Sequence, residues 1–368
     1  MFDVAIIGAG LAGLTCAQQL HQAGYSVVVV DKSRGVGGRM ATRRLHDTRA
    51  DHGVRYLEPQ GKLLQQLIEI LLQRGILQAW TDTIYELTSR QSKSGVTSHS
   101  HPSQLTRYVA PAGMTAVAKF LATNLEIWLN RRVESITPTE KQTWHLTLDS
   151  TDEMPKELTA RAVVVAIPAP QALMLLESLV QTNLPPAFLD SLRSVEFDPC
   201  LSVMAGYSAV GEIHQLPLPA WKACTISNDT DLAWIGLDSS KRSDAQIPIF
   251  VLQSTAEFAK LYLDAKDLNP AGQQLLCRAA QLLIPWLYTP DWFQVHRWRY
   301  AFPSRPLNQD CLDTTTPLPI VCCGDWCGGN LIESAMNSGL AAAVQINSQM
   351  QKRTLPGENF LEVSWRQG

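Results

Sequence analysis

The pattern of apolar positions at the start of the chain predicts a strand-helix-strand unit. Residues 2–7 and 25–30 are short apolar runs, and this pattern predicts two buried strands. Between them, residues 9–23 carry leucines at helical spacing. Residues 62–74 repeat the helical pattern, whereas residues 31–61 are rich in glycine and arginine and predict a loop that contacts a ligand.

The apolar pattern further along predicts a second group of elements in the same lobe. A hairpin or loop is expected over the serine-rich residues 88–104, followed by a helix over residues 113–122. Strands are expected at residues 126–129, 133–136, 144–148, 162–167 and 320–323. Residues 332–350 predict a final helix that closes this lobe.

Between about residue 170 and residue 303 the pattern changes, and it predicts a second sheet. The strand-like segments are residues 200–208, 221–227, 232–237 and 248–254. We therefore expect a second lobe that is built on a sheet of its own.

The composition is typical of a large globular protein. The 368 residues are 45% apolar and 18% charged, which supplies a core and excludes general disorder. The net charge of -3 gives no field that would attract nucleic acid or an anionic membrane. No signal-peptide pattern follows Met1, and the apolar residues 162–175 are too short to span a bilayer. We expect a soluble cytoplasmic protein with no membrane or nucleic-acid partner, reduced cysteines and no metal site.

A glycine-rich turn joins the first predicted strand to its helix. Gly8, Gly10 and Gly13 have the spacing of a dinucleotide-binding motif, and Asp31 ends the next strand eighteen positions after Gly13. The glycines allow a tight turn, a close approach of the backbone to a pyrophosphate, and close packing of the helix on the strand. The pyrophosphate would lie at the helix N-terminus, and Asp31 would accept hydrogen bonds from a ribose.

Two further segments favour FAD over a nicotinamide cofactor. The Gly-Gly-Arg segment at residues 37–39 lets backbone amides approach a pyrophosphate, and Arg39 offers a planar fork to phosphate oxygens. Residues 324–325 form a glycine-acid turn before the last helix, which would place Asp325 at the ribityl or pyrophosphate part of FAD. The N-terminus of that helix would stabilise the anion formed when the flavin takes up a hydride.

The sequence resembles the renalase family, within the flavin-containing amine oxidase superfamily. The blocks that carry the resemblance near the N-terminus are GGRMATRR at residues 37–44, ADHGVRY at 50–56 and YVAPAGM at 108–114. Those in the middle of the chain are residues 198–200, 220–228, 233–241 and 296–300. The resemblance covers nearly the whole chain, and the middle blocks distinguish renalase-like proteins from amine oxidases in general.

The resemblance implies an α/β fold of the amine-oxidase type, with a Rossmann-type FAD-binding lobe and a second, mixed-sheet α+β substrate lobe. The FAD-binding lobe would comprise residues 1–60, 105–170 and 305–350, the substrate lobe residues 61–104 and 171–304, and the C-terminal tail residues 351–368. FAD would be bound non-covalently. The expected cofactor-binding residues are Gly8, Gly10, Leu11, Ala12, Gly13, Asp31, Lys32, Gly38, Arg39, Met40, Asp51, His52, Gly53, Val133, Gly324, Asp325, Asn330, Ile332 and Glu333.

The activity implied by the resemblance is the oxidation of misreduced dihydronicotinamide dinucleotides. The 2- and 6-dihydro isomers of NAD(P)H would give a hydride to flavin N5 and become NAD(P)+, and O2 would reoxidise the flavin to give hydrogen peroxide. No C–H proton has to be removed, so positioning is the main demand. The expected catalytic residues are Tyr56, Asn228, Gln253, His296 and Trp298. Weaker candidates are Trp221, Trp234 and Trp326 for the cavity wall, and Lys222 and Arg299 for the substrate phosphates.

Two alternatives stay open at this point. The FAD segments are also compatible with an oxidase or desaturase of amines or apolar substrates. Amine oxidases typically hold a lysine near the flavin, and the sequence does not assign Lys222, Lys241 or Lys260 to that role. A flavin-binding sensor without turnover would carry the same cofactor motifs.

Overall fold

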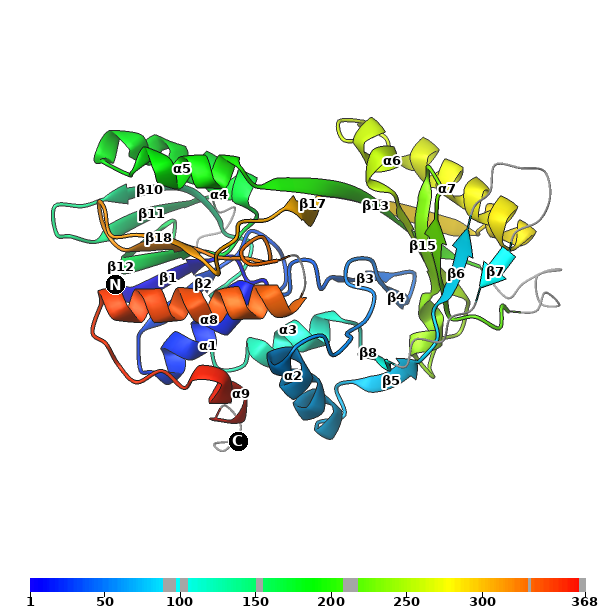
Figure 1. Ribbon diagram of the computed structural model, residues 1–368, viewed down its shortest axis with the longest axis horizontal. Coiled ribbons are helices and arrows are strands. Elements are labelled where there is room, and N and C mark those ends of the chain that lie inside the picture. The colour runs from blue at the N-terminus through cyan, green and yellow to red at the C-terminus, as the bar shows by residue number, and fades with distance from the viewer. Residues whose placement is uncertain (89–96, 100–104, 150–154, 208–217, 330–331, 364–368) are drawn as a thin grey trace.

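The computed structural model consists of two lobes, each built on a β-sheet (Figure 1). The structure describes residues 1–88, 97–99, 105–149, 155–207, 218–329 and 332–363. The predicted fold class is confirmed, because a Rossmann-type α/β lobe is joined to a second lobe that contains a mixed sheet.

The first lobe contains an eight-stranded sheet with a parallel centre. The strands are β1 Phe2–Ile7, β2 Val27–Val30, β9 Glu126–Trp128, β10 Arg132–Pro138, β11 Trp144–Asp149, β12 Glu157–Val165, β18 Leu312–Thr314 and β19 Ile320–Cys322. The main path runs β10-β11-β12-β1-β2-β9, with β19 beside β12 and β18 beside β19. The helices that cover its two faces are α1 Leu11–Gln22, α3 Thr115–Leu121 and α8 Ile332–Gln349 on one, and α4 Ala169–Leu176 and α5 Pro186–Arg193 on the other.

Alternate residues of the central strand supply two separate hydrophobic cores. Val4 and Ile6 of β1 pack in the cluster that includes α1 and α8. Ala5 and Ile7 pack in the cluster that includes α4 and α5. Because both faces of the strand are buried, its sequence is a continuous apolar run rather than an alternating one.

The second lobe contains a seven-stranded sheet in the order β17-β13-β16-β15-β14-β6-β7. Its strands are β6 Tyr85–Thr88, β7 Thr97–His99, β13 Glu196–Gly206, β14 Ala223–Ser227, β15 Leu232–Leu237, β16 Ile249–Ser254 and β17 Trp292–Arg305. Strands β6 and β14 pair in parallel, and the other pairs are antiparallel. Helices α6 Ala256–Leu261 and α7 Asn269–Leu282 cover the face that is turned away from the first lobe (Figure 1).

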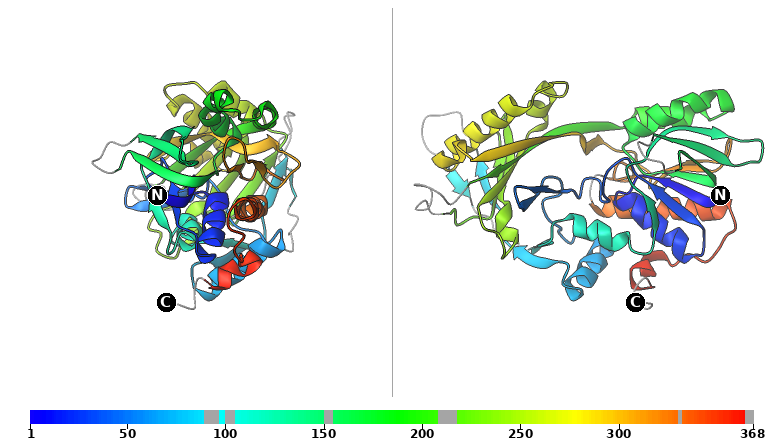
Figure 2. Two further views of the ribbon diagram at one scale, coloured as in Figure 1. Left: turned by 90° about the vertical axis from the view of Figure 1, so that its left-hand side faces the viewer. Right: turned by 180° about the vertical axis from the view of Figure 1, so that it is seen from behind.

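Two long strands connect the lobes. Strands β13 and β17 extend from the second sheet to the first lobe (Figure 2). The register of their pairing shifts between Asp198 and Cys200, which marks a bulge in β17. The small elements nearby are the β3 Thr42–Leu45 and β4 Thr48–Asp51 hairpin, the pair β5 Gln78–Thr81 and β8 Arg107–Val109, α2 Lys62–Gln73, α9 Phe360–Val363, and the 3-10 helices η1 Glu177–Thr182, η3 Asp238–Lys241, η4 Pro285–Tyr288 and η5 Gly357–Asn359. No described helix is long and apolar enough to cross a membrane.

The predicted elements occur with shifted ends, and a few differ. Residues 31–61 contain the β3–β4 hairpin, whose side chains are mostly only partly buried and so give no apolar run. The mixed aromatic and charged sequence of β17 did not predict a strand. Strands β6 and β7 form a hairpin within residues 85–99, and residues 89–96 and 100–104 lie outside the described residues. Helix α2, expected in the second lobe, packs against α8 of the first lobe.

Candidate functional site

A cleft of about 2400 Å³ lies between the two lobes, and residues from both line it. The predicted site residues in its lining are Gly8, Gly10, Leu11, Ala12, Asp31, Lys32, Gly38, Arg39, Met40, His52, Gly53, Tyr56, Val133, Gln253, His296, Trp298, Gly324, Asp325 and Ile332. The fold therefore brings together segments that are far apart in the sequence.

The first turn of α1 is shaped to admit a phosphate group. Gly10 is the N-cap of this helix, and none of the described side chains caps it. A Cβ atom on Gly10 would meet nothing within 4 Å, whereas one on Gly13 would lie 2.0 Å from the carbonyl oxygen of Gly8. Gly13 thus allows the helix to pack on the turn, while Gly10 leaves open space at a helix N-terminus, where phosphates bind.

Asp31 lies at the end of β2, next to this turn. Its carboxylate accepts hydrogen bonds from the backbone N–H of Ala9 and of Ser33, both at 2.7 Å. These bonds fix the carboxylate at the wall of the cleft and leave further lone pairs for a ligand. The turn and Asp31 together fit the pyrophosphate and ribose of a dinucleotide.

Arg39 and Asp325, each expected to contact the cofactor, also form an ion pair with each other. The two guanidinium nitrogens of Arg39 donate to the two carboxylate oxygens of Asp325 at 2.7 and 2.6 Å. Arg39 also donates to the carbonyl oxygen of Ala301, at the bulge of β17. The pair joins the Gly-Gly-Arg loop, the long strand and the C-terminal glycine-acid turn where all three line the cleft.

An aromatic group forms another part of the wall. Trp298 stacks on His52 with ring centroids 5.2 Å apart, and its indole N–H donates to the backbone oxygen of His52 at 2.8 Å. His296 contacts both rings at 4.7 and 4.3 Å. Burial lowers the pKa of His52 to about 3, and the nearby His296 and Arg43 lower it further. Burial also lowers the pKa of His296 to about 4, again together with Arg43. Both imidazoles are therefore neutral at pH 7.

Two family models match the chain. Residues 6–71 match the NAD(P)-binding Rossmann-like domain, and residues 79–347 match the flavin containing amine oxidoreductase family. The chain belongs to the flavin-containing amine oxidoreductase family. As a member of this family, the protein is a flavoprotein with FAD as its cofactor.

Solved structures share the fold of this flavoprotein. Putrescine oxidase bound to putrescine aligns with a TM-score of 0.69 and 15% identity, over 94% of this chain and 99% of that one. Cyclohexylamine oxidase from Brevibacterium oxydans aligns with a TM-score of 0.66 and 13% identity, over 95% and 99% of the two chains. At these identities the similarity shows the fold alone.

Similarity to curated sequences is local. The L-amino-acid oxidase of Crotalus adamanteus is 39% identical over 66 residues. This match covers 18% of the flavoprotein and 13% of that relative. A match of this extent supports a shared segment and does not identify a substrate.

Asp51 is not in the lining of the cleft, so the structure gives no support for its predicted contact with the cofactor. Its side chain is fully buried and forms ion pairs with Lys241 at 3.1 Å and with Arg242 at 3.4 Å. Its carboxylate also accepts from the Thr42 hydroxyl at 2.6 Å and from the backbone N–H of Met114 at 2.9 Å. These partners occupy Asp51 within the protein and make it a structural residue of the flavoprotein.

Two other predicted site residues also lie elsewhere. The carboxylate of Glu333 accepts from the backbone N–H of Leu63 at 3.1 Å and of Leu64 at 2.6 Å, so it caps α2 rather than facing the cofactor. Asn228 is exposed in the turn between β14 and β15, where a φ of 58° favours asparagine, and it does not line the cleft. Asn330 lies outside the described residues.

The weaker lysine and arginine candidates have partners in the protein. Lys222 donates to the carbonyl oxygen of Trp80 at 2.6 Å, and Arg299 donates to Asp264 at 2.8 Å. Lys241 is buried with Asp51, and Lys260 pairs with Glu257 on the surface. None of these three lysines is in the lining of the cleft.

The tryptophan candidates separate in the same way. Trp326 lines the cleft, although its indole N–H is used by the carbonyl oxygen of Ile167. Trp221 packs on Phe250 in the core of the second lobe, and Trp234 is 1% exposed. Core packing therefore accounts for Trp221 and Trp234.

Arg55 is a cleft residue that sequence analysis did not single out. It lines the cleft together with Tyr56 and Gln253, and its Nε donates to the side-chain oxygen of Gln253 at 2.6 Å. The amide nitrogen of Gln253 donates in turn to the backbone oxygen of Gly53 at 2.9 Å. The signal for Arg55 in the sequence is its place in the ADHGVRY block, in which Asp51, His52, Gly53 and Tyr56 are the predicted site residues.

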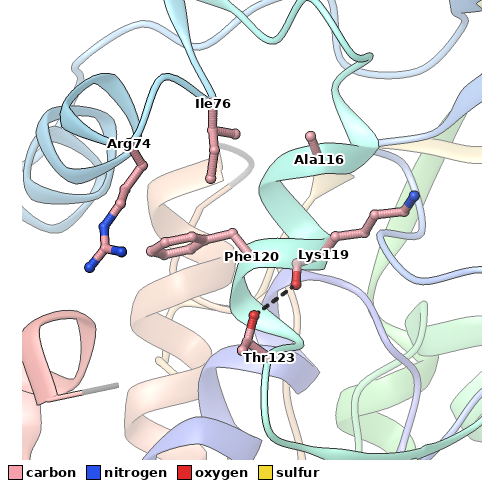
Figure 3. Close-up of a pocket in the computed structure, with 6 residues that line it drawn as sticks. All are labelled: Arg74, Ile76, Ala116, Lys119, Phe120 and Thr123. Carbon is pink, nitrogen blue, oxygen red and sulfur yellow. Dashed lines mark hydrogen bonds between the residues drawn. The ribbon is translucent and has the colours of Figure 1, made fainter. Parts of the chain in front are cut away.

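A smaller hollow of about 360 Å³ lies between the end of α2 and α3 (Figure 3). Figure 3 shows the side chains of Arg74 and Lys119 pointing in opposite directions, with Phe120 and Ile76 between them. It contains none of the predicted site residues. The chemistry of the flavoprotein is therefore assigned to the large cleft.

Proposed function

We propose that this flavoprotein oxidises misreduced dihydronicotinamide dinucleotides, the 2- and 6-dihydro isomers of NAD(P)H, to NAD(P)+. The observation that carries the proposal is the charge of the cleft. The renalase-like blocks in the middle of the chain support the same substrate class.

The lining of the cleft is strongly cationic, although the chain as a whole has a net charge of -3. Twelve basic residues line it: Lys32, Arg34, Arg39, Arg43, Arg44, Arg49, Arg55, Lys119, Arg131, Arg132, Arg297 and Arg299. Four acidic residues line it: Asp31, Glu58, Glu134 and Asp325. Such a surface attracts polyanions and repels cations. A dinucleotide is an anion, whereas an aliphatic amine is a cation at neutral pH.

The size of the cleft also supports a large substrate. Its volume of about 2400 Å³ exceeds the roughly 300–1,000 Å³ of an ordinary small-molecule site. The part of the cleft that fits FAD is lined by the glycine turn, Asp31 and Arg39. The rest of the cleft is lined by the aromatic group, Arg55 and Gln253, of which Gln253 and Trp298 belong to the second sheet. The space therefore accommodates a second dinucleotide beside the cofactor.

The residues near the aromatic group suit a reaction without a strong base. When bound, FAD supplies the hydride acceptor and transfers the electrons to O2, which gives hydrogen peroxide. His52 and His296 are neutral, and Trp298 is held against His52 by its indole hydrogen bond. These side chains orient a flat ring and exclude water around it, which is what a hydride transfer demands.

A second candidate is the oxidation of an amine, which the family and the fold of putrescine oxidase favour. Against it stand the cationic lining and the positions of Lys222, Lys241 and Lys260, all outside the cleft lining. An amine oxidase of the lysine-dependent kind needs a lysine beside the flavin ring, whereas the lysines of the cleft lining are Lys32, next to Asp31, and Lys119 of α3.

The test is anaerobic stopped-flow measurement of flavin bleaching. The FAD-loaded protein is mixed with 2-dihydro-NAD, 6-dihydro-NAD, ordinary NADH, putrescine and L-leucine in parallel. We expect rapid bleaching by at least one misreduced isomer, and slow or no bleaching by NADH, putrescine and L-leucine. Bleaching by putrescine or L-leucine alone would establish the second candidate. Bleaching by none of them, with FAD tightly bound, would support a flavin-binding sensor.

A further inference from the structure

Arg55 differs from the other charged residues discussed so far in how it is held. It is partly buried in the wall of the cleft, in the extended segment that follows β4. Its Nε–H donates to the side-chain oxygen of Gln253 at 2.6 Å. Its guanidinium carbon lies 4.8 Å from the centre of the Trp234 ring, so the planar group lies over an aromatic face.

None of the described residues gives Arg55 a carboxylate partner. A guanidinium group has five N–H donors, and the bond to Gln253 uses one of them. Burial lowers the pKa of Arg55, and the groups that oppose this effect are Cys200 and Tyr56 rather than an acid. A cation taken out of water without a counter-charge is unfavourable, so such a group normally has an anionic partner.

The partners of Arg55 fix its direction without neutralising it. The amide of Gln253 is itself held by the backbone oxygen of Gly53 at 2.9 Å. Three other arginines of the cleft, in contrast, have acids beside them: Arg39 has Asp325, Arg49 has Asp244 and Arg299 has Asp264. Arg55 is therefore a pre-positioned cation whose remaining N–H donors are available to a molecule in the cleft.

We propose that Arg55 binds an anionic group of the substrate and that Gln253 positions it for this task. The inference rests on the proposed function, in which the anionic group is a phosphate of the dinucleotide. The planar fork of an arginine matches the two oxygens of a phosphate or a carboxylate, which a lysine does not match in the same way. Arg55 would thus select substrates that carry such a group.

The test measures binding rather than turnover, with probes that differ in one charged group. Isothermal titration of the FAD-loaded protein compares nicotinamide mononucleotide with nicotinamide riboside, which lacks the phosphate. A second pair, benzoate and benzamide, compares a carboxylate with a neutral amide of similar shape. We expect the wild type to prefer the mononucleotide over the riboside.

The Arg55→Gln variant should lose this preference, through a loss of mononucleotide affinity of about 10- to 150-fold. The Arg55→Lys variant keeps the positive charge but not the planar guanidinium, so it should lose less mononucleotide affinity than Arg55→Gln. It also serves as the second variant if Arg55→Gln does not fold. The matched control is Arg305→Gln, at the end of the same β17 that carries Trp298, where Arg305 is exposed and faces Glu196. It should bind all four probes as the wild type does.

An unchanged preference for the mononucleotide in both Arg55 variants would overturn the proposal. A loss confined to benzoate over benzamide would overturn the phosphate assignment and identify a carboxylate instead. Because no turnover is measured, the result is separate from the flavin-bleaching test. Failure of every dihydronicotinamide to bleach the flavin would reject the proposed function even where Arg55 binds the phosphate.

Discussion

Two groups of charged side chains at the junction of the lobes differ in how their charge is balanced. In the first, which we call the closed cluster, Asp51 and Asp238 form ion pairs with Lys241 and Arg242 at 2.7 to 3.4 Å. These four side chains are 0–2% exposed. In the second group, the wall of the cleft, basic residues outnumber acidic ones, and Arg55 has no acid beside it among the described residues.

The difference separates structural charges from charges that a ligand completes. Burial alone would raise the pKa of Asp238, but Lys241 and Arg242 outweigh it and hold that pKa below its usual value. Each charge of the closed cluster therefore has its counter-charge in the protein. The cleft wall has an excess of positive charge, which an anionic cofactor and substrate would balance.

One short segment connects the two groups. Asp51 belongs to the closed cluster, and the next two residues accept hydrogen bonds through their backbone oxygens, His52 from Trp298 and Gly53 from Gln253. Two residues further on, Arg55 faces the cleft. The closed cluster therefore anchors the segment that presents His52 and Arg55 to the ligand space.

The largest effect is expected from opening the closed cluster. In a Lys241→Met variant, Asp51 and Asp238 would share Arg242 alone, which leaves a buried negative charge uncompensated. The free energy of unfolding should fall by about 3–5 kcal/mol. Guanidinium-induced unfolding at pH 7, with FAD in excess, measures the change.

The control for this variant is Lys260→Met. Lys260 is 47% exposed and pairs with Glu257 at 2.7 Å and with Asp198 at 3.6 Å, so its removal should leave the free energy of unfolding almost unchanged. Equal losses in the two variants would mean that the closed cluster contributes no more than a surface pair. That outcome would contradict the structural role given to Asp51.

A smaller effect is expected from changing the cleft wall at Arg39. Arg39→Ala removes the bidentate pair with Asp325 and leaves that carboxylate unpaired in the space that fits FAD. The affinity for FAD should fall by about 10- to 150-fold, equivalent to about 1.5–3 kcal/mol. Titration of the apoprotein with FAD, followed by flavin fluorescence, gives the dissociation constant.

The matched control for Arg39 is Arg193→Ala on α5. Arg193 also has two acidic contacts, Glu177 and Asp190, but it lies outside the cleft lining. FAD affinity should stay within about twofold of the wild type, since a surface pair contributes little. If the Arg39→Ala variant bound FAD as tightly as the wild type, the Arg39–Asp325 pair would hold the two chain segments together without contributing to cofactor binding.

The parts of the fold that the sequence predicted are those encoded by local patterns. The unit β1-α1-β2 follows from two apolar runs and from the spacing of Gly8, Gly10 and Gly13, which are close together in the sequence. Asp31 follows from its position at the end of the second strand. In these places, residue type and spacing determine the geometry with little help from distant segments.

The predicted site residues that lie away from the cleft have partners that are distant in the sequence. Asp51 and His52 are neighbours in one motif, yet successive residues of an extended chain point to opposite sides, so Asp51 meets Lys241 and His52 meets the cleft. Glu333 caps α2, a helix some 270 positions earlier. Nothing in a local pattern shows that a carboxylate is already occupied.

The smallest effect is expected from the pair of neutral histidines in the cleft wall. Because the pKa of His52 is lowered to about 3 and that of His296 to about 4, neither takes up a proton in the folded protein at pH 5. In the unfolded chain both bind a proton below their ordinary pKa of about 6.5. Stability contributed by the neutral pair is therefore complete above pH 6.5 and falls as the pH drops toward 4.

The expected slope is up to about 1.4 kcal/mol per pH unit for each histidine, because the unfolded state binds one more proton than the folded state. A His296→Gln variant removes one such group, so its free energy of unfolding should depend less steeply on pH between 6 and 4.5 than that of the wild type. Urea unfolding at intervals across pH 4.5–8 measures both slopes, and above pH 7 the two curves should run parallel. Identical slopes below pH 6 would mean that folded His296 takes up its proton near the ordinary pKa, and that water rather than a dry aromatic wall surrounds it.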